Sequence, residues 1–132
     1  MQLLHRVVGF LTLAAFLGTG QYMRHVLDLE NASLAEHFFL RSRHIYILGA
    51  ALVHLALSVG LKPSPAGWRR RLQLLASTLL TAASVLMVAG FFLESPQLDP
   101  GSFDRAGLYA LLAGTLLHVL ASLRAPDQPI RT

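Results

Sequence analysis

Six histidines carry most of the chemical capacity of this 132-residue sequence, and two of them fall inside apolar stretches. His54 lies in HIYILGAALVHLALSVGLK, residues 44–62, and His118 lies in YALLAGTLLHVLAS, residues 109–122. A neutral imidazole can ligate a metal, exchange a proton or form a hydrogen bond. Because an ionisable side chain inside an apolar helix is a functional candidate, these two histidines are the first candidates for a site.

The spacing predicts that His54 and His118 lie at nearly the same depth in a membrane. His54 precedes Lys62 by eight residues and His118 precedes Arg124 by six, which correspond to about 12 Å and about 9 Å along a helix. In an up-down bundle the second and fourth helices are diagonal partners, roughly 11–14 Å apart. This separation predicts one haem b held between the two histidines as axial ligands of the iron.

Small residues beside the two histidines favour the haem hypothesis. Gly114 lies one turn before His118, and Ala51 lies about one turn before His54. Their small side chains would leave room for a flat macrocycle, which would bring the redox chemistry. The expected function is electron transfer in a membrane, with a quinone or another membrane protein as partner.

Two other interpretations of these histidines stay open. The first is hydrogen bonding to hydroxyl groups of neighbouring helices, for which Thr81, Ser84 and Thr115 are available. The chain would then be a non-enzymatic accessory or assembly subunit of a larger membrane complex. The second is another proton-related or quinone-related role.

The four remaining histidines lie near the ends of the apolar stretches. His5 is expected to be solvated at the membrane surface, beside Arg6, or to serve as an alternative ligand. His25, His37 and His44 would form an outer zinc or copper site if the chain brought them together. Their spacings of twelve and seven residues match no established metal motif.

Four apolar stretches must position these side chains. The sequence is 54% hydrophobic and 14% charged, with a mean hydropathy of +0.53, whereas soluble domains are about 25% charged. The stretches cover residues 4–23, 44–61, 72–93 and 106–123, and a transmembrane helix needs roughly 17–25 residues. We expect an all-α integral membrane protein of one domain, residues 1–132, with four transmembrane helices in an up-down-up-down bundle and a loose tail at 125–132.

Basic residues predict the orientation of this bundle. The side that holds both termini and the loop between the second and third stretches carries seven of them: Arg6, Lys62, Arg69, Arg70, Arg71, Arg124 and Arg131. The other side carries four, so both termini are expected in the cytoplasm, and the lipid bilayer is expected to be a bacterial cytoplasmic membrane. The basic rim, with Trp68 beside it, would face anionic lipid.

Small and polar residues repeat on one face of three stretches, and we expect these faces to pack inside the bundle or within a homo-oligomer. The faces are His5, Gly9, Thr12, Phe16 and Thr19; Ser77, Thr81, Ser84 and Val88; and Gly107, Leu111, Gly114, His118 and Ala121. The segment NASLAEHFFLR, residues 31–41, predicts a short helix on the membrane surface with an Asn or Ser cap.

Several function classes are excluded by what the sequence lacks. Because there is no cysteine, there is no disulfide, thiolate metal site or cysteine nucleophile. The sequence has no HExxH motif, no glycine-rich phosphate loop and no pattern indicating a Ser-His-Asp triad. A nucleic-acid partner is not expected, because WRRR is one short cluster without a reading element.

Overall fold

The computed structural model describes residues 1–27, 33–60, 67–94 and 101–123. These residues form four α-helices and their ends: α1 (Gln2–His25), α2 (Leu34–Gly60), α3 (Trp68–Leu93) and α4 (Ser102–Ser122). Each helix is long and apolar enough to cross a membrane. The predicted all-helical fold with four potential membrane spans is therefore confirmed, while the predicted tail at 125–132 lies outside the described residues.

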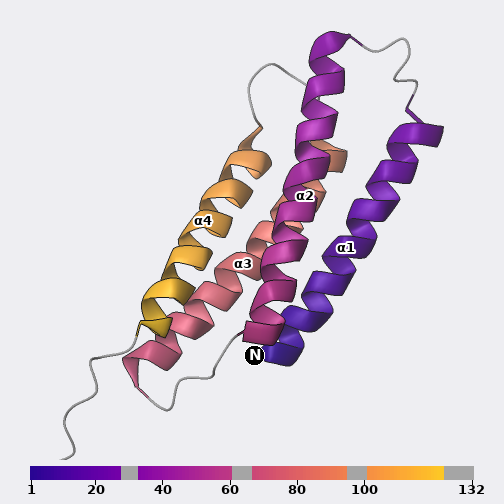
Figure 1. Ribbon diagram of the computed structural model, residues 1–132. Helices are drawn as coiled ribbons and strands as arrows, with labels where there is room; N and C mark the ends of the chain where they lie inside the picture. The colour runs from indigo at the N-terminus through magenta and orange to yellow at the C-terminus, as the bar shows by residue number, and fades with distance from the viewer. Residues whose placement is uncertain (28–32, 61–66, 95–100, 124–132) are drawn as a thin grey trace, which may run out of the picture.

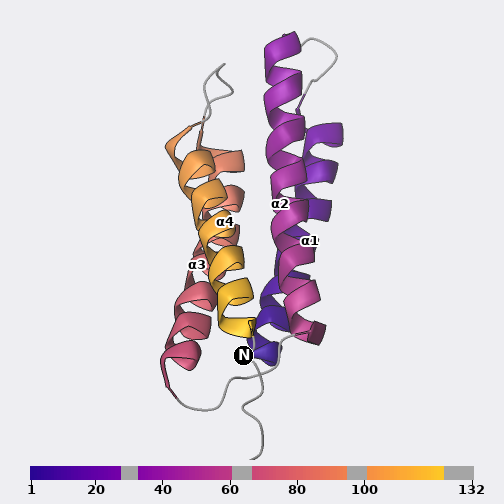
Figure 2. The same cartoon turned by 60° about the vertical axis from the view of Figure 1, so that its left-hand side comes forward.

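The four helices are arranged as two hairpins that lie side by side (Figures 1 and 2). The most extensive packing lies within the hairpins, between α1 and α2 and between α3 and α4. The hairpins meet mainly where α2 packs on α3, and among the described residues no Cα atoms of α1 and α4 come within 8 Å. We call the end where α1 begins the His5 end of the molecule, and the opposite end the Arg43 end.

Burial along α1 follows the helical period that the sequence predicts. His5, Gly9, Thr12 and Thr19 are buried, at steps of three, four or seven residues. Gly9 allows α1 to approach α2 closely, because a Cβ atom there would lie 2.9 Å from Cδ2 of Leu55. The small-residue face is therefore the packing face of α1.

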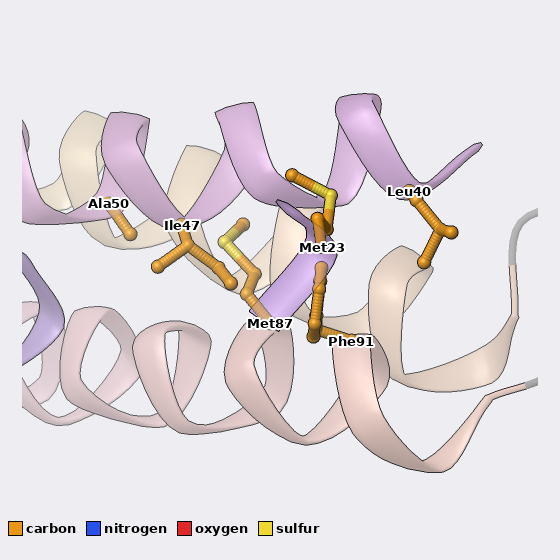
Figure 3. Close-up of a cluster of buried hydrophobic side chains, with 6 residues drawn as sticks. All are labelled: Met23, Leu40, Ile47, Ala50, Met87 and Phe91. Atoms are coloured by element: carbon orange, nitrogen blue, oxygen red, sulfur yellow. The ribbon is translucent and has the colours of Figure 1, made fainter. Parts of the chain in front are cut away.

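An apolar cluster lies between α1, α2 and α3 (Figure 3). It consists of Met23 from α1, Leu40, Ile47 and Ala50 from α2, and Met87 and Phe91 from α3. Because lipid is as apolar as these side chains, close packing rather than the hydrophobic effect stabilises such a cluster in a membrane.

The beginning of α2 differs from the prediction. The Ser33 hydroxyl accepts a hydrogen bond from the Glu36 amide (3.3 Å), and the Glu36 carboxylate accepts one from the Ser33 amide (2.7 Å). This reciprocal pair is a capping box, so the predicted Ser cap is present. The predicted separate surface helix is absent, because residues from Leu34 onward continue without a break into α2.

Candidate functional site

All four helices contribute one side chain each to a contact between three histidines and one serine near the His5 end. The Nδ1 atoms of His5 and His54 are 2.9 Å apart, and Nε2 of His5 lies 3.0 Å from the Ser77 hydroxyl. The same hydroxyl lies 3.3 Å from Nε2 of His118. None of the four side chains is more than 3% exposed. We call these four residues the histidine cluster.

One assignment of tautomers accounts for all of these contacts between three neutral imidazoles and Ser77. The Ser77 hydroxyl donates its single hydrogen to the Gln73 carbonyl oxygen (2.8 Å). Its oxygen must therefore accept hydrogen bonds from Nε2–H of both His5 and His118. Because His5 carries its hydrogen on Nε2, its Nδ1 is an acceptor, and His54 must donate from Nδ1–H.

This assignment leaves one nitrogen lone pair on each of the two predicted haem ligands. Nε2 of His54 and Nδ1 of His118 are buried and have no hydrogen-bond partner among the described residues. An imidazole nitrogen with a free lone pair can take up a proton or bind a metal. In this cluster, Nε2 of His54 and Nδ1 of His118 are the atoms that could do so.

The position of His5 corrects the sequence analysis. A solvated histidine at the membrane surface was predicted, whereas His5 is fully buried and contacts rings from two other helices. Its ring centroid lies 5.0 Å from that of His54 and 5.3 Å from that of His118. His5 therefore contacts both predicted ligands, His54 and His118.

The hydroxyl partners also differ from those proposed from sequence. Thr81 and Thr115 donate to carbonyls of their own helices, those of Ser77 and Leu111. Ser84 is buried and has no partner among the described residues. The partner is instead Ser77, which the predicted packing face of α3 already contained.

The fit of a haem can be tested at Gly114. A Cβ atom there would lie 2.8 Å from Cγ of Leu80 and 3.0 Å from the Ala76 carbonyl oxygen, so α3 fills the space that the glycine was expected to leave open. Ala51 is likewise fully buried. The closed packing of α3 against α4 leaves no slot for a macrocycle beside Gly114. At this position the residues present do not fit a haem.

The structure does not bring the three outer histidines together as a metal site. The His44 ring stacks on Phe16 with centroids 4.0 Å apart, and its Nδ1 lies 3.0 Å from the Thr19 hydroxyl, so His44 joins α2 to α1. His25 ends α1, and His37 lies in the first turn of α2. Over the described ranges, no group of three or more histidine, aspartate or glutamate side chains could hold a metal ion.

A buried ion-pair network at the Arg43 end was missed by the sequence analysis. Nε of Arg43 donates to the Asp104 carboxylate (2.6 Å), and Nη1 donates to the Glu94 carbonyl oxygen (2.7 Å). The Glu94 carboxylate lies 3.6 Å from Nη2 of Arg43 and accepts a hydrogen bond from the Phe103 amide at the start of α4 (2.7 Å). The Arg43 side chain is 1% exposed. Arg43 precedes His54 by eleven residues, about three helical turns, so both lie on the same face of α2. This spacing could have indicated that Arg43 is buried.

Comparisons with known proteins assign no function to these sites. The chain matches no protein-family model, no curated protein and no solved structure.

Proposed function

We propose that the protein is a non-enzymatic subunit of a larger membrane complex, in which the histidine cluster fastens its two helical hairpins together. The observation that carries this proposal is the contact between His5 and Ser77. His5 and His54 belong to the first hairpin, Ser77 and His118 to the second, and the 3.0 Å contact joins them.

The ion pairs of Arg43 supply a second connection at the opposite end. Arg43 belongs to the first hairpin, and its partners Glu94 and Asp104 belong to the end of α3 and to α4. Breaking a buried ion pair by removal of one partner is strongly destabilising, because the other charge stays buried. Polar contacts at both ends thus hold one relative position of the hairpins, as a subunit needs if it is to present fixed faces to a partner.

Electron transfer with one haem b is the second candidate function, and the two free imidazole lone pairs favour it. Histidine ligands of metals typically donate their other ring N–H to a fixed acceptor, which sets the tautomer. Here His54 and His118 both donate in this way, to His5 and to Ser77. Haem ligation would require α3 and α4 to move apart at Gly114, because Leu80 and Ala76 of α3 fill the space there. When bound, the haem would supply one-electron redox chemistry.

One experiment distinguishes the two candidates. The chain is extracted from its native membrane in mild detergent, and its visible spectrum and native mass are recorded. We expect no Soret band, before or after incubation with haem, and a protein mass well above the 14.4 kDa of one chain. A variant His5→Ala should lose the large assembly. A Soret band that disappears in both His54→Ala and His118→Ala would replace the subunit proposal by the haem proposal, and a colourless chain that is monomeric in the wild type would refute both.

The orientation and location belong to the same proposal. We propose that the helices form an up-down-up-down bundle with both termini in the cytoplasm, and that the membrane is a bacterial cytoplasmic membrane. The support is the count of basic residues on the two sides. A second copy of the chain, another membrane protein or a quinone would be the partner within the bilayer.

A further inference from the structure

The two ends of the molecule carry the same number of arginines among the described residues but very different net charges. The His5 end carries Arg6, Arg69, Arg70 and Arg71 and no acidic side chain; the Arg43 end carries Arg24, Arg41, Arg43 and Arg105 together with Glu36, Glu94 and Asp104. The described side chains therefore sum to +4 at the first end and to 4 − 3 = +1 at the second. Acidic partners balance the arginines at one end only.

Three of the four arginines at the His5 end lie in the first turn of α3. Arg70 and Arg71 are exposed, and Arg69 is half-buried, with its guanidinium carbon 5.6 Å from the ring centroid of Trp68. The Trp68 side chain is 61% exposed. Tryptophan concentrates at the membrane–water interface, so this turn lies at the depth of the lipid headgroups if α3 spans the bilayer.

The arginines of this turn are not explained by the stability of α3. The beginning of a helix carries a partial positive charge, which favours acidic side chains and disfavours cations. The first turn of α3 contains no acidic residue, and Gly67 before it provides no side-chain cap. Their charge is therefore available to an external anion.

We propose that the segment Trp68–Arg71 binds the phosphate headgroup of anionic phospholipids. Guanidinium groups donate paired hydrogen bonds to phosphate oxygens, and the ring of Trp68 would pack beside the upper acyl chains. Anionic lipid at a membrane surface attracts each nearby arginine by about 1 kcal/mol, and 1.4 kcal/mol corresponds to a tenfold change in affinity. Each exposed arginine should therefore raise the preference for anionic lipid by about fivefold. The proposal requires only that α3 spans a membrane and is independent of the function of the histidine cluster.

Trp68 is the single tryptophan of the chain, so its fluorescence reports on this turn alone. The full-length protein is reconstituted in phosphatidylcholine vesicles that contain either brominated phosphatidylglycerol or brominated phosphatidylcholine, with bromines close to the glycerol backbone. With about fivefold from each of Arg70 and Arg71, we expect the anionic lipid to quench Trp68 at a mole fraction lower by roughly 25-fold. The difference should shrink as salt is raised, because salt screens exposed charges. Millimolar inorganic phosphate should leave it unchanged if the lipid headgroup is the ligand.

Matched variants separate this turn from a general effect of charge. Arg70→Gln/Arg71→Gln should lower the preference for phosphatidylglycerol by at least fivefold. Arg24→Gln/Arg41→Gln removes two exposed arginines from the Arg43 end and should leave the preference unchanged. Equal quenching of the wild type by the two lipids, at low and at high salt, would refute the proposal without any variant. An equal loss in both double variants would refute it as well.

Discussion

Replacement of His5 by alanine should be strongly destabilising, because this side chain joins the two hairpins. It removes the contacts with His54 and Ser77, and it leaves Nδ1–H of His54 buried without an acceptor. Hydrogen bonds between membrane helices contribute about 0.6 kcal/mol on average and up to about 1.7, so two bonds account for about 1–3 kcal/mol. The unpaired donor adds about 1 kcal/mol or more. We expect His5→Ala to lower the free energy of unfolding by about 3 kcal/mol.

The assay is reversible unfolding in mixed micelles of a mild detergent and dodecyl sulfate, followed by circular dichroism. His118→Ala loses one longer contact, at 3.3 Å, and should cost about 1 kcal/mol. Thr12→Ala is the control, because this buried residue of the same helix donates only to the Val8 carbonyl of α1 itself. It should change stability by less than about 0.5 kcal/mol.

A double-mutant cycle tests the contact between the hairpins directly. His5→Ala and Ser77→Ala should be non-additive by about 0.5–1.7 kcal/mol, because each variant removes the same hydrogen bond. The reasoning would be refuted if His5→Ala cost no more than Thr12→Ala, or if the two losses simply added.

The remaining predictions concern charge, packing and orientation. Arg43→Met should lower the free energy of unfolding by about 3–5 kcal/mol, because Asp104 and Glu94 keep their buried charges; a triple variant that also carries Asp104→Asn and Glu94→Gln should recover most of the loss. If the triple variant does not regain stability in the same unfolding assay, buried unpaired charge is not the cause of the loss in Arg43→Met. Gly114→Ala should cost about 1–3 kcal/mol, because its Cβ would lie 2.8 Å from a leucine of α3, whereas Gly49→Ala, with nothing within 4 Å, should gain up to about 1 kcal/mol. A reporter fused to the C-terminal end should be active in the cytoplasm, and activity on the opposite side would overturn the proposed orientation.

Hydropathy and helical period were sufficient to predict the helices and most of the packing faces. In α4 the predicted face contained Gly107, Gly114, His118 and Ala121, and all four are buried. The relative position of the helices could not be predicted in this way, because it depends on which side-chain volumes interlock. Leu80 of α3 occupies the space at Gly114, and no periodicity in either helix indicates that pairing.

Only part of the site was predicted, again because the relative position of the helices could not be derived from the sequence. His54 and His118 were selected because they lie deep in apolar stretches, and the structure places them near each other. His5 lies beside Arg6 at the expected membrane surface, so its position suggested a solvated side chain. It is buried because Gly9 lets α1 approach α2 closely. Arg43 was counted as an ordinary surface charge because charge counting ignores helical phase, although its spacing from Ile47 and His54 places it on the buried face of α2.

The division into two hairpins has a consequence for the biogenesis of the protein. Each hairpin contains a complete pair of tightly packed helices, so a translocon can release the first hairpin into the lipid while the second is still being synthesised. Before the second hairpin is in place, Nε2–H of His5 lacks its acceptor Ser77, and Arg43 lacks its partners Glu94 and Asp104. These unpaired groups disfavour a long-lived half-inserted chain and favour docking of the second hairpin. We therefore expect association of the hairpins to be the last step of assembly.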